Sequence, residues 1–383
     1  MRTSEGNMGP SAACASCLRR SWLLAELSAS LDYSAGDRVR LMELLELGDG
    51  ELMQALGGRR RAELKARHAQ LDTAEICPIE GVEAVCRHDR RYPRTLSGAG
   101  APPMLNVAGG LARLREMTAG PVVAIAGSRR ASDYGVEMAK SLARGLAASG
   151  VTVTSGLADG ISAAAQAGAL EVPGRSLAVI AGGVDVGCPA KRRSMYARVI
   201  RGGCAVAELP CGSPARRWGH PASERIVASL ASVTVLVEAE EIAHELLGAQ
   251  LALARGRTVA AVPGRVTSPL SRGPHALLVG GAHLVRGPAD VLELLDDVEA
   301  PALEGIGATR PELEPRLRSV LEKVGAGRDT PDKLTASRED ATKVLLALTE
   351  LELMGLLGRG DGGRYVPRDA SWSCALPTER RHG

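Results

Sequence analysis

Runs of consecutive apolar residues alternate with amphipathic segments from about residue 120 to about residue 295. Continuous runs of Val, Ile and Ala are typical of parallel strands buried on both faces, whereas apolar residues three and four apart indicate helices. The strand-like runs are VVAIAGS, VTVTSG, SLAVIAGG, CAVAEL, SVTVLVEA, RTVAAVPG and AHLVRG. The pattern predicts an α/β fold with an extended Rossmann-like doubly wound sheet, in which ligands bind where the strands end.

Helical patterns stand before and after this sheet. The front segments WLLAELSASL, RVRLMELLELG and GELMQALGG predict a module of short helices, of helix-hairpin-helix or sterile-alpha type. After the sheet, a helix, a short helix, a longer helix and a hairpin follow in the order of a winged helix. The predicted domains are a disordered tail (1–20), the helical module (21–75), the Rossmann-like domain (76–298), a linker (299–310), the winged helix (311–368) and a tail (369–383).

The longer helix of the winged unit is a candidate recognition helix, over Ser337–Leu357. It carries Arg338 and Lys343, but also several acidic residues. This acidity favours contact with another protein over the reading of duplex DNA.

Composition limits how the chain can bind a polyanion. The 383 residues carry a net charge of only +3, so any such binding must come from local basic clusters. Aromatic residues make up 2% of the chain and Phe is absent, which leaves few side chains on which bases could stack.

Eight cysteines are scattered along the chain, and only Cys14 and Cys17 have the spacing of metal ligands. The sequence has no second pair of residues at the spacing that would complete a metal site with them. We therefore predict no metal site and free thiols in a reducing cytoplasm. No apolar run is long enough to span a membrane, and the start of the chain lacks the apolar core of a signal peptide.

The first candidate anion site is the turn Gly127-Ser128-Arg129, which follows a predicted strand and opens a predicted helix. A glycine there lets backbone N–H groups approach a phosphate, and the helix N-terminus favours negative charge. Arg130 adds a second cation. The turn is neither a complete dinucleotide fingerprint nor a P-loop, so the sequence predicts no nucleotide cofactor.

Further candidates come from later loops. A second glycine-rich turn contains Ser155, Gly156 and Gly160, and its glycines serve either an anion or close helix packing. A basic loop supplies Lys191 and Arg192 as phosphate-binding cations, unless it is only a solvated charge run.

Near the end of another predicted strand, Trp218 lies close to several arginines. We weigh two interpretations of Trp218, a platform that stacks a base and a buried core residue. His220 has no catalytic or metal partner at a suitable spacing, and no nucleophile arrangement is evident, so we predict no enzymatic activity.

These residues resemble the signatures of the bacterial DNA-processing protein A (DprA/Smf) family. The matches include Gly127, Ser128, Arg129, Ser132, Tyr134 and Gly135, then SGLA with GI at 155–161, AVPG at 261–264 and SRG at 271–273. The resemblance implies an extended Rossmann fold that binds single-stranded DNA without sequence preference and without catalysis. It also implies a dimer that protects the incoming strand and loads the RecA recombinase in natural transformation, with phosphates held by the turn at Arg129 and the Lys191 loop.

The chain departs from the family pattern in the expected pocket. The family's Arg-Gly-Ile-Asp-x-x-Ala-His reads here as DGISAAAQ, with Asp159, Ser162 and Gln166, and its Arg-Asn-Arg-Ile-Ile begins with Ser223 and Glu224, leaving Arg225 as a phosphate ligand. Lost polar and basic groups predict weaker DNA binding or a changed ligand. The alternative function is therefore a divergent Rossmann-like protein that binds a nucleotide or another small phosphate ligand.

Overall fold

The computed structural model describes residues 11–76, 79–96, 101–186, 190–241, 246–299, 314–325, 328, 330–335, 338–353, 357–359 and 364–367. The chain divides into two compact units, residues 1–300 and 301–383. Residues 1–10, residues 300–310 of the predicted linker, the predicted tail 369–383, Cys188 and Ser337 fall outside the described residues. The finer domain boundaries within each unit stay predictions.

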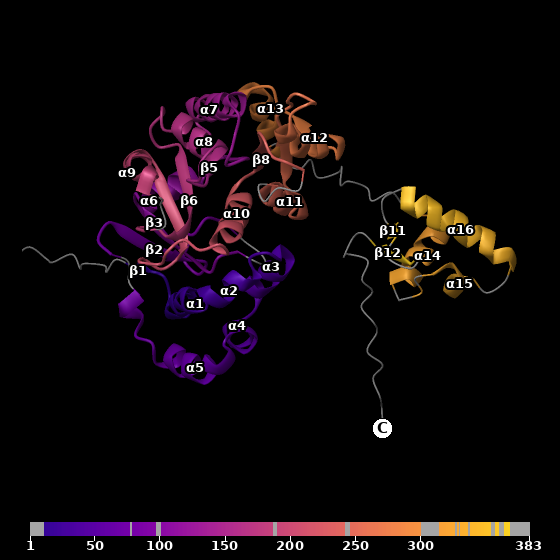
Figure 1. Ribbon diagram of the computed structural model, residues 1–383, viewed down its shortest axis with the longest axis horizontal. Coiled ribbons are helices and arrows are strands. Elements are labelled where there is room, and N and C mark those ends of the chain that lie inside the picture. Colours follow the sequence, from indigo (N-terminus) through magenta and orange to yellow (C-terminus); the bar gives the residue numbers. More distant parts are fainter. Residues whose placement is uncertain are drawn as a thin grey trace, which may run out of the picture. The chain divides into compact units, whose positions relative to one another are not determined.

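A ten-stranded sheet forms the centre of the first unit (Figure 1), in the order β1-β2-β3-β7-β6-β5-β4-β8-β9-β10. Strands β4 to β10 run parallel to one another, as predicted, and β3 is antiparallel to both of its neighbours. The strands are β1 (Ser11–Ala12), β2 (Val82–Cys86), β3 (Met104–Ala108), β4 (Val122–Ala126), β5 (Thr152–Ser155), β6 (Ser176–Gly183), β7 (Cys204–Leu209), β8 (Val233–Leu236), β9 (Thr258–Ala261) and β10 (His283–Leu284).

The order of the strands places a topological switch point between β4 and β8. The chain moves from β4 through β5 and β6 to β7 in one direction, and then returns to β8, β9 and β10 on the other side of β4. Doubly wound sheets bind ligands beside the carboxyl ends of strands at such a point. The turn after β4 is the Gly127 turn, so the predicted site lies at the switch point.

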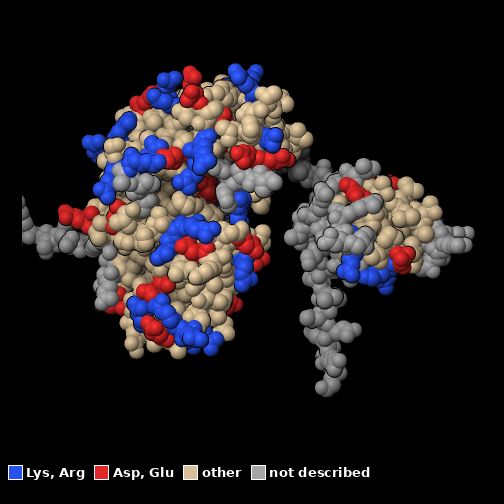
Figure 2. Space-filling view, viewed as in Figure 1, with Lys and Arg blue, Asp and Glu red and all other residues tan. Residues whose placement is uncertain are grey.

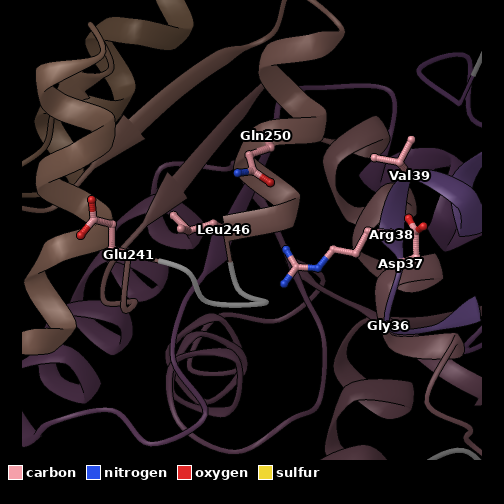
Figure 3. A pocket seen from close by; sticks show the side chains of 7 residues that line it. All are labelled: Gly36, Asp37, Arg38, Val39, Glu241, Leu246 and Gln250. Atoms are coloured by element: carbon pink, nitrogen blue, oxygen red, sulfur yellow. The ribbon is translucent and has the colours of Figure 1, made fainter. Parts of the chain in front are cut away.

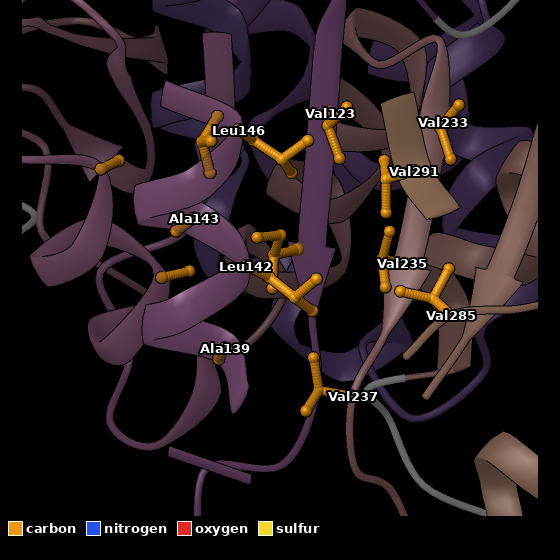
Figure 4. Packing of buried hydrophobic residues seen from close by; sticks show 14 of the residues in the cluster. Val123, Ala139, Leu142, Ala143, Leu146, Val233, Val235, Val237, Val285 and Val291 are labelled. Atoms are coloured by element: carbon orange, nitrogen blue, oxygen red, sulfur yellow. The ribbon is translucent and has the colours of Figure 1, made fainter. Parts of the chain in front are cut away.

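Helices cover both faces of the sheet. In β4, Val123 and Ile125 pack in one hydrophobic cluster with helices α7, α8 and α13, while Val122 and Ala124 pack in another with α6 and α10. Figure 4 shows the first cluster, where α7 lies against β4 and β8. The helices are α6 (Leu111–Met117), α7 (Asp133–Ala148), α8 (Ile161–Ala169), α9 (Arg193–Gly202), α10 (Gly219–Leu230), α11 (Leu247–Ala254), α12 (Arg272–Val279) and α13 (Pro288–Glu299).

The front helices pack onto the sheet domain instead of standing apart from it. Their leucines share one hydrophobic cluster with Leu209, Trp218 and Ala222. The backbone N–H of Trp218 donates to Asp32 Oδ1 at 3.1 Å, and the Ser21 hydroxyl donates to the carbonyl of Glu208 at 2.9 Å. The helices are α1 (Ala15–Glu26), α2 (Ser28–Ser34), α3 (Arg38–Glu46), α4 (Asp49–Leu56) and α5 (Arg61–Gln70).

Two expectations about the start of the chain are wrong. Residues 15–20 belong to α1, although we predicted a disordered tail to residue 20, because Cys17 and Leu18 are buried against the first strands. Strand β2 was likewise not among the predicted strands, so the sheet extends further toward the start of the chain than expected.

The second unit contains α14 (Pro315–Gly325), α15 (Pro331–Leu334), α16 (Arg338–Leu353) and the antiparallel pair of β11 (Leu357–Arg359) and β12 (Tyr365–Pro367). Leu321, Leu348, Leu351 and Leu357 are buried in its own hydrophobic cluster. The order of elements agrees with the predicted one. Its assignment as a winged helix stays a prediction.

Replacing Trp218 with Ala should destabilise the first unit, because Trp218 is 1% exposed and joins the front helices to the sheet domain. We expect a loss of about 3–5 kcal/mol in the free energy of unfolding, the usual cost of removing a buried aromatic ring. Denaturation followed by circular dichroism measures it. Tyr33→Ala, at a side chain 92% exposed, is the matched control and should change stability by less than about 0.5 kcal/mol.

Candidate nucleic-acid interface

The structure brings the two glycine-rich turns into direct contact. Strands β4 and β5 are parallel neighbours, and the N–H of Ile161 donates to the carbonyl of Ser128 at 3.1 Å. Gly160 has a φ of +73°, and a Cβ there would collide with the Ser128 carbonyl oxygen. Glycine at this position therefore allows the β5–α8 turn to lie directly against the β4–α7 turn.

The N-terminus of α7 already holds a carboxylate, that of Glu238. The backbone N–H of Ser132 donates to Glu238 Oε2 at 2.8 Å, and the Ser132 hydroxyl donates to Glu238 Oε1 at 2.5 Å. The same hydroxyl accepts a hydrogen bond from the N–H of Gly135 and so caps the helix. A Cβ on Gly135 would overlap the Glu238 carboxylate, so a side chain at this position would displace that carboxylate.

The backbone of the first turn is also used within the fold. The N–H of Ser128 donates to the carbonyl of Glu238 at 2.6 Å, and the N–H of Arg130 donates to Ser128 Oγ at 3.1 Å. These two N–H groups therefore do not point at a ligand, which differs from our expectation for the turn. A glycine turn and a helix N-terminus favour an anion, and here a carboxylate of the chain supplies it.

The side chains of Arg129 and Arg130 face solvent beside this turn. Desolvation lowers the pKa of the His220 imidazole, and the positive charge of Arg129 lowers it further. Arg129 thus acts electrostatically on the start of α10, and its backbone lies against Gly160 of the second turn. The cationic part of the first turn consists of side chains, not backbone amides.

Asp159 in the second turn binds both cations of the basic loop. Its carboxylate is ion-paired with Lys191 Nζ, and its Oδ1 accepts from Arg192 Nε at 3.1 Å. The hydrogen bond from Lys191, followed by that from Arg192, lowers the pKa of Asp159. Asp159, where the resemblance leads us to expect a cation, thus neutralises part of the predicted phosphate-binding loop.

Arg225 is not part of this surface. It is 2% exposed and forms an ion pair with Glu208, which is also buried. A buried pair of this kind holds α10 to β7 and does not offer the guanidinium to a surface ligand, so our expectation for Arg225 is corrected. Of the two interpretations of Trp218, the structure likewise supports the core residue, which does not stack a base.

The predicted site residue Ser155 and two residues that depart from the family pattern, Gln166 and Ser223, bond within the fold. The Ser155 hydroxyl donates to the carbonyl of Ile125 at 2.7 Å. Gln166 is fully buried, and its Nε2 donates to the carbonyls of Ser155 and Leu177 at 3.1 Å each. The Ser223 hydroxyl donates to the His220 carbonyl at 2.8 Å. Gln166 and Ser155 therefore satisfy buried polar groups, which is a structural role.

A separate cleft of about 500 Å³ lies between the start of α3 and helix α11 (Figure 3). Arg38 extends across it from the front helices toward Gln250 on α11. Its lining residues are Gly36, Asp37, Arg38, Val39, Glu241, Leu246 and Gln250. None of them belongs to the two glycine turns.

The sequence analysis did not find one cluster of potential metal ligands. Cys14 and Cys17 lie beside Cys86 and His88, and the four candidate ligand atoms are within 4.8 Å of one another. The expectation that no second pair of ligands completes a site with Cys14 and Cys17 is therefore wrong. The spacing Cys-x-His at 86–88 was the available signal, and it was weak because a whole helical module separates the two pairs.

Comparison with known proteins identifies the family. The family described as DNA recombination-mediator protein A matches residues 83–296, more than half of the chain. The chain belongs to this family. A Mycobacterium tuberculosis protein named as a DNA processing protein DprA is 36% identical over 356 residues, which cover 89% of each chain. The Escherichia coli protein Smf is 34% identical over 289 residues, 72% of this chain and 74% of Smf.

Solved structures of the DNA recombination-mediator family share the fold. The X-ray structure of DNA processing protein A from Streptococcus pneumoniae superposes with a TM-score of 0.57 at 29% identity, over 72% of this chain and 95% of that one. DNA processing protein A from Helicobacter pylori superposes with a TM-score of 0.50 at 23% identity, over 56% of this chain and 96% of that one. Among the described residues, no helix is long and apolar enough to cross a membrane.

Glu238→Gln tests whether the carboxylate at α7 organises the switch point. Gln keeps the size of the side chain but removes the charge from the helix N-terminus, so we expect a loss of about 1–2 kcal/mol in the free energy of unfolding. Glu240→Gln, two residues away and exposed, should leave stability unchanged within about 0.5 kcal/mol. Equal stability of Glu238→Gln and Glu240→Gln in urea denaturation would contradict this role of Glu238.

Proposed function

We propose that this protein binds single-stranded DNA without sequence preference and without catalysis, through phosphate contacts of Arg129, Arg130, Lys191 and Arg192. The observation that carries the proposal is the contact between the two glycine turns. It gathers the exposed arginines of the first turn and the Lys191–Asp159–Arg192 group at the same carboxyl edge of the sheet.

The charge pattern favours binding through the phosphates of the strand and not through its bases. Lysine and arginine side chains bind phosphates wherever they meet them, regardless of base sequence. Basic and acidic side chains alternate over the visible face of the first unit (Figure 2), which agrees with the net charge of +3. Binding at a few local cations gives a moderate affinity that depends on salt.

Relatives support the choice of ligand and the role that follows binding. The Helicobacter pylori protein is described as having a single-stranded DNA binding mode, and the family is described as a recombination mediator. We extend both to this chain, with transfer of the bound strand to the RecA recombinase during natural transformation. A homodimer in the cytoplasm completes the proposal.

The alternative ligand is a nucleotide or another small phosphate, and its usual binding position is occupied by a side chain of the protein. In doubly wound sheets that place is the helix N-terminus at the switch point. The Glu238 carboxylate holds that position at the start of α7. An anionic ligand there would meet a negative charge, so the proposal stays with DNA at the outer cations.

Arg129→Ala combined with Arg130→Ala should weaken binding to a labelled single strand at least about tenfold, because two charged contacts are lost. The dependence of log K on log salt concentration should become shallower by about 0.7 for each phosphate contact removed. Fluorescence anisotropy at several salt concentrations measures both. Arg144→Ala, near the other end of α7, is the matched control, and an equal loss with that variant would contradict the assigned surface.

Asp159→Asn should strengthen binding, because it releases Lys191 and Arg192 from their shared carboxylate. We expect a steeper salt dependence and an affinity several-fold higher, on the order of one additional phosphate contact. In a Lys191→Met, Arg192→Met background the same substitution should have little effect. A gain of equal size in that background would show that Asp159 acts only through the general charge of the surface.

A further inference from the structure

Four potential metal ligands converge where the front helices meet the sheet. Cys14 is the N-cap residue of α1, and Cys17 lies in the first turn of that helix. Cys86 is the last residue of β2, and His88 follows in the adjoining turn. The two pairs are distant in sequence, and the parallel pairing of β1 with β2 brings them together.

The distances within this cluster agree with one tetrahedral ion. His88 Nδ1 lies 3.2 Å from Cys14 Sγ, 3.5 Å from Cys17 Sγ and 3.8 Å from Cys86 Sγ. Zinc takes sulfur ligands at about 2.3 Å and nitrogen ligands at about 2.0–2.1 Å, so neighbouring ligand atoms around a tetrahedral ion lie about 3.5–3.8 Å apart. All four ligand atoms lie within 4.8 Å of one another, so small side-chain adjustments centre an ion among them.

We propose that Cys14, Cys17, Cys86 and His88 form a structural Zn²⁺ site. Three thiolates and one imidazole are soft to borderline ligands in a tetrahedral set, which suits zinc and not magnesium or calcium. Four protein ligands leave no open position for substrate, so the site is structural and takes no part in a reaction.

A backbone hydrogen bond and the burial of the cysteines hold the ligands in position. The backbone N–H of Cys14 donates to Cys86 Sγ at 3.4 Å, a contact that orients a sulfur ligand and stabilises its negative charge. Cys17 and Cys86 are buried, and Cys14 is half-buried. His88 closes the set from the exposed side.

The ion would fasten the beginning of α1 to the sheet. Without it, this end is joined through the two residue pairs of β1 with β2 and the small cluster around Cys17 and Leu18. A two-residue strand offers little stabilisation against the entropy of the chain before α1. A metal bond to each of the two segments would hold residues 11–18 in place, ahead of the part of α1 that Leu23 and Leu24 already anchor in the core.

The metal content of the full chain, purified without a histidine tag and under reducing conditions, tests the site. We expect inductively coupled plasma mass spectrometry to find about one zinc ion per chain. Cys14→Ser combined with His88→Ala changes only the two more exposed ligands, so the fold should persist while bound zinc falls to background. Cys211→Ser is the matched control outside the cluster and should retain the metal.

Cobalt substitution gives a second readout that does not depend on stability. Co²⁺ added to the metal-free chain should produce the visible bands of a tetrahedral ion and a thiolate charge-transfer band. The double variant should show neither. Absence of zinc in the wild type together with absence of these cobalt bands would overturn the proposal.

Hydrogen exchange locates the effect of the metal. Removal of zinc by a chelator should increase exchange in α1 and leave α14 and α16 of the second unit unchanged. If exchange in α1 is unchanged after zinc is shown to be removed, the ion does not hold the beginning of α1 against the sheet.

Discussion

The hydrogen bonds of the Glu238 carboxylate organise the carboxyl edge of the sheet, and the other features of the candidate site depend on them. This buried side chain follows β8 and binds Ser132 at the N-terminus of α7, while its backbone carbonyl holds the N–H of Ser128. One residue thus connects the two strands on either side of the switch point. Gly127 and Gly135 provide the space, because a Cβ at either position would collide with Glu238.

This arrangement changes what the switch point can bind. A doubly wound sheet normally offers a helix N-terminus and free backbone amides to a phosphate. Here the N–H groups of Ser128, Arg130 and Ser132 bond within the fold, and the exposed positive charge of the turn lies on the side chains of Arg129 and Arg130. Ion pairing of Asp159 with Lys191 and Arg192 reduces that charge further. These features favour the proposed extended polyanion over a small phosphate ligand at this edge.

Much of the fold could be predicted from the sequence because it follows from local periodicity. Each of the seven apolar runs becomes a strand, β4 to β10, and the helices between them cover both faces. The failures concern burial and distant contacts. Nothing local shows that Arg225 faces Glu208 inside the protein, or that Gln166 spans β5 and β6. Cys86 and His88 join Cys14 and Cys17 only after β1 has paired with β2.

Phosphates, and not bases, are proposed to hold a single strand to this edge of the sheet. Anisotropy competition between a natural single strand and an abasic strand of equal length tests this most directly, because the abasic strand keeps every phosphate and has no base to stack. We expect the two strands to compete within about twofold, since backbone contacts carry the affinity. Failure of the abasic strand to compete would show that bases carry the binding, and would contradict a phosphate-held strand.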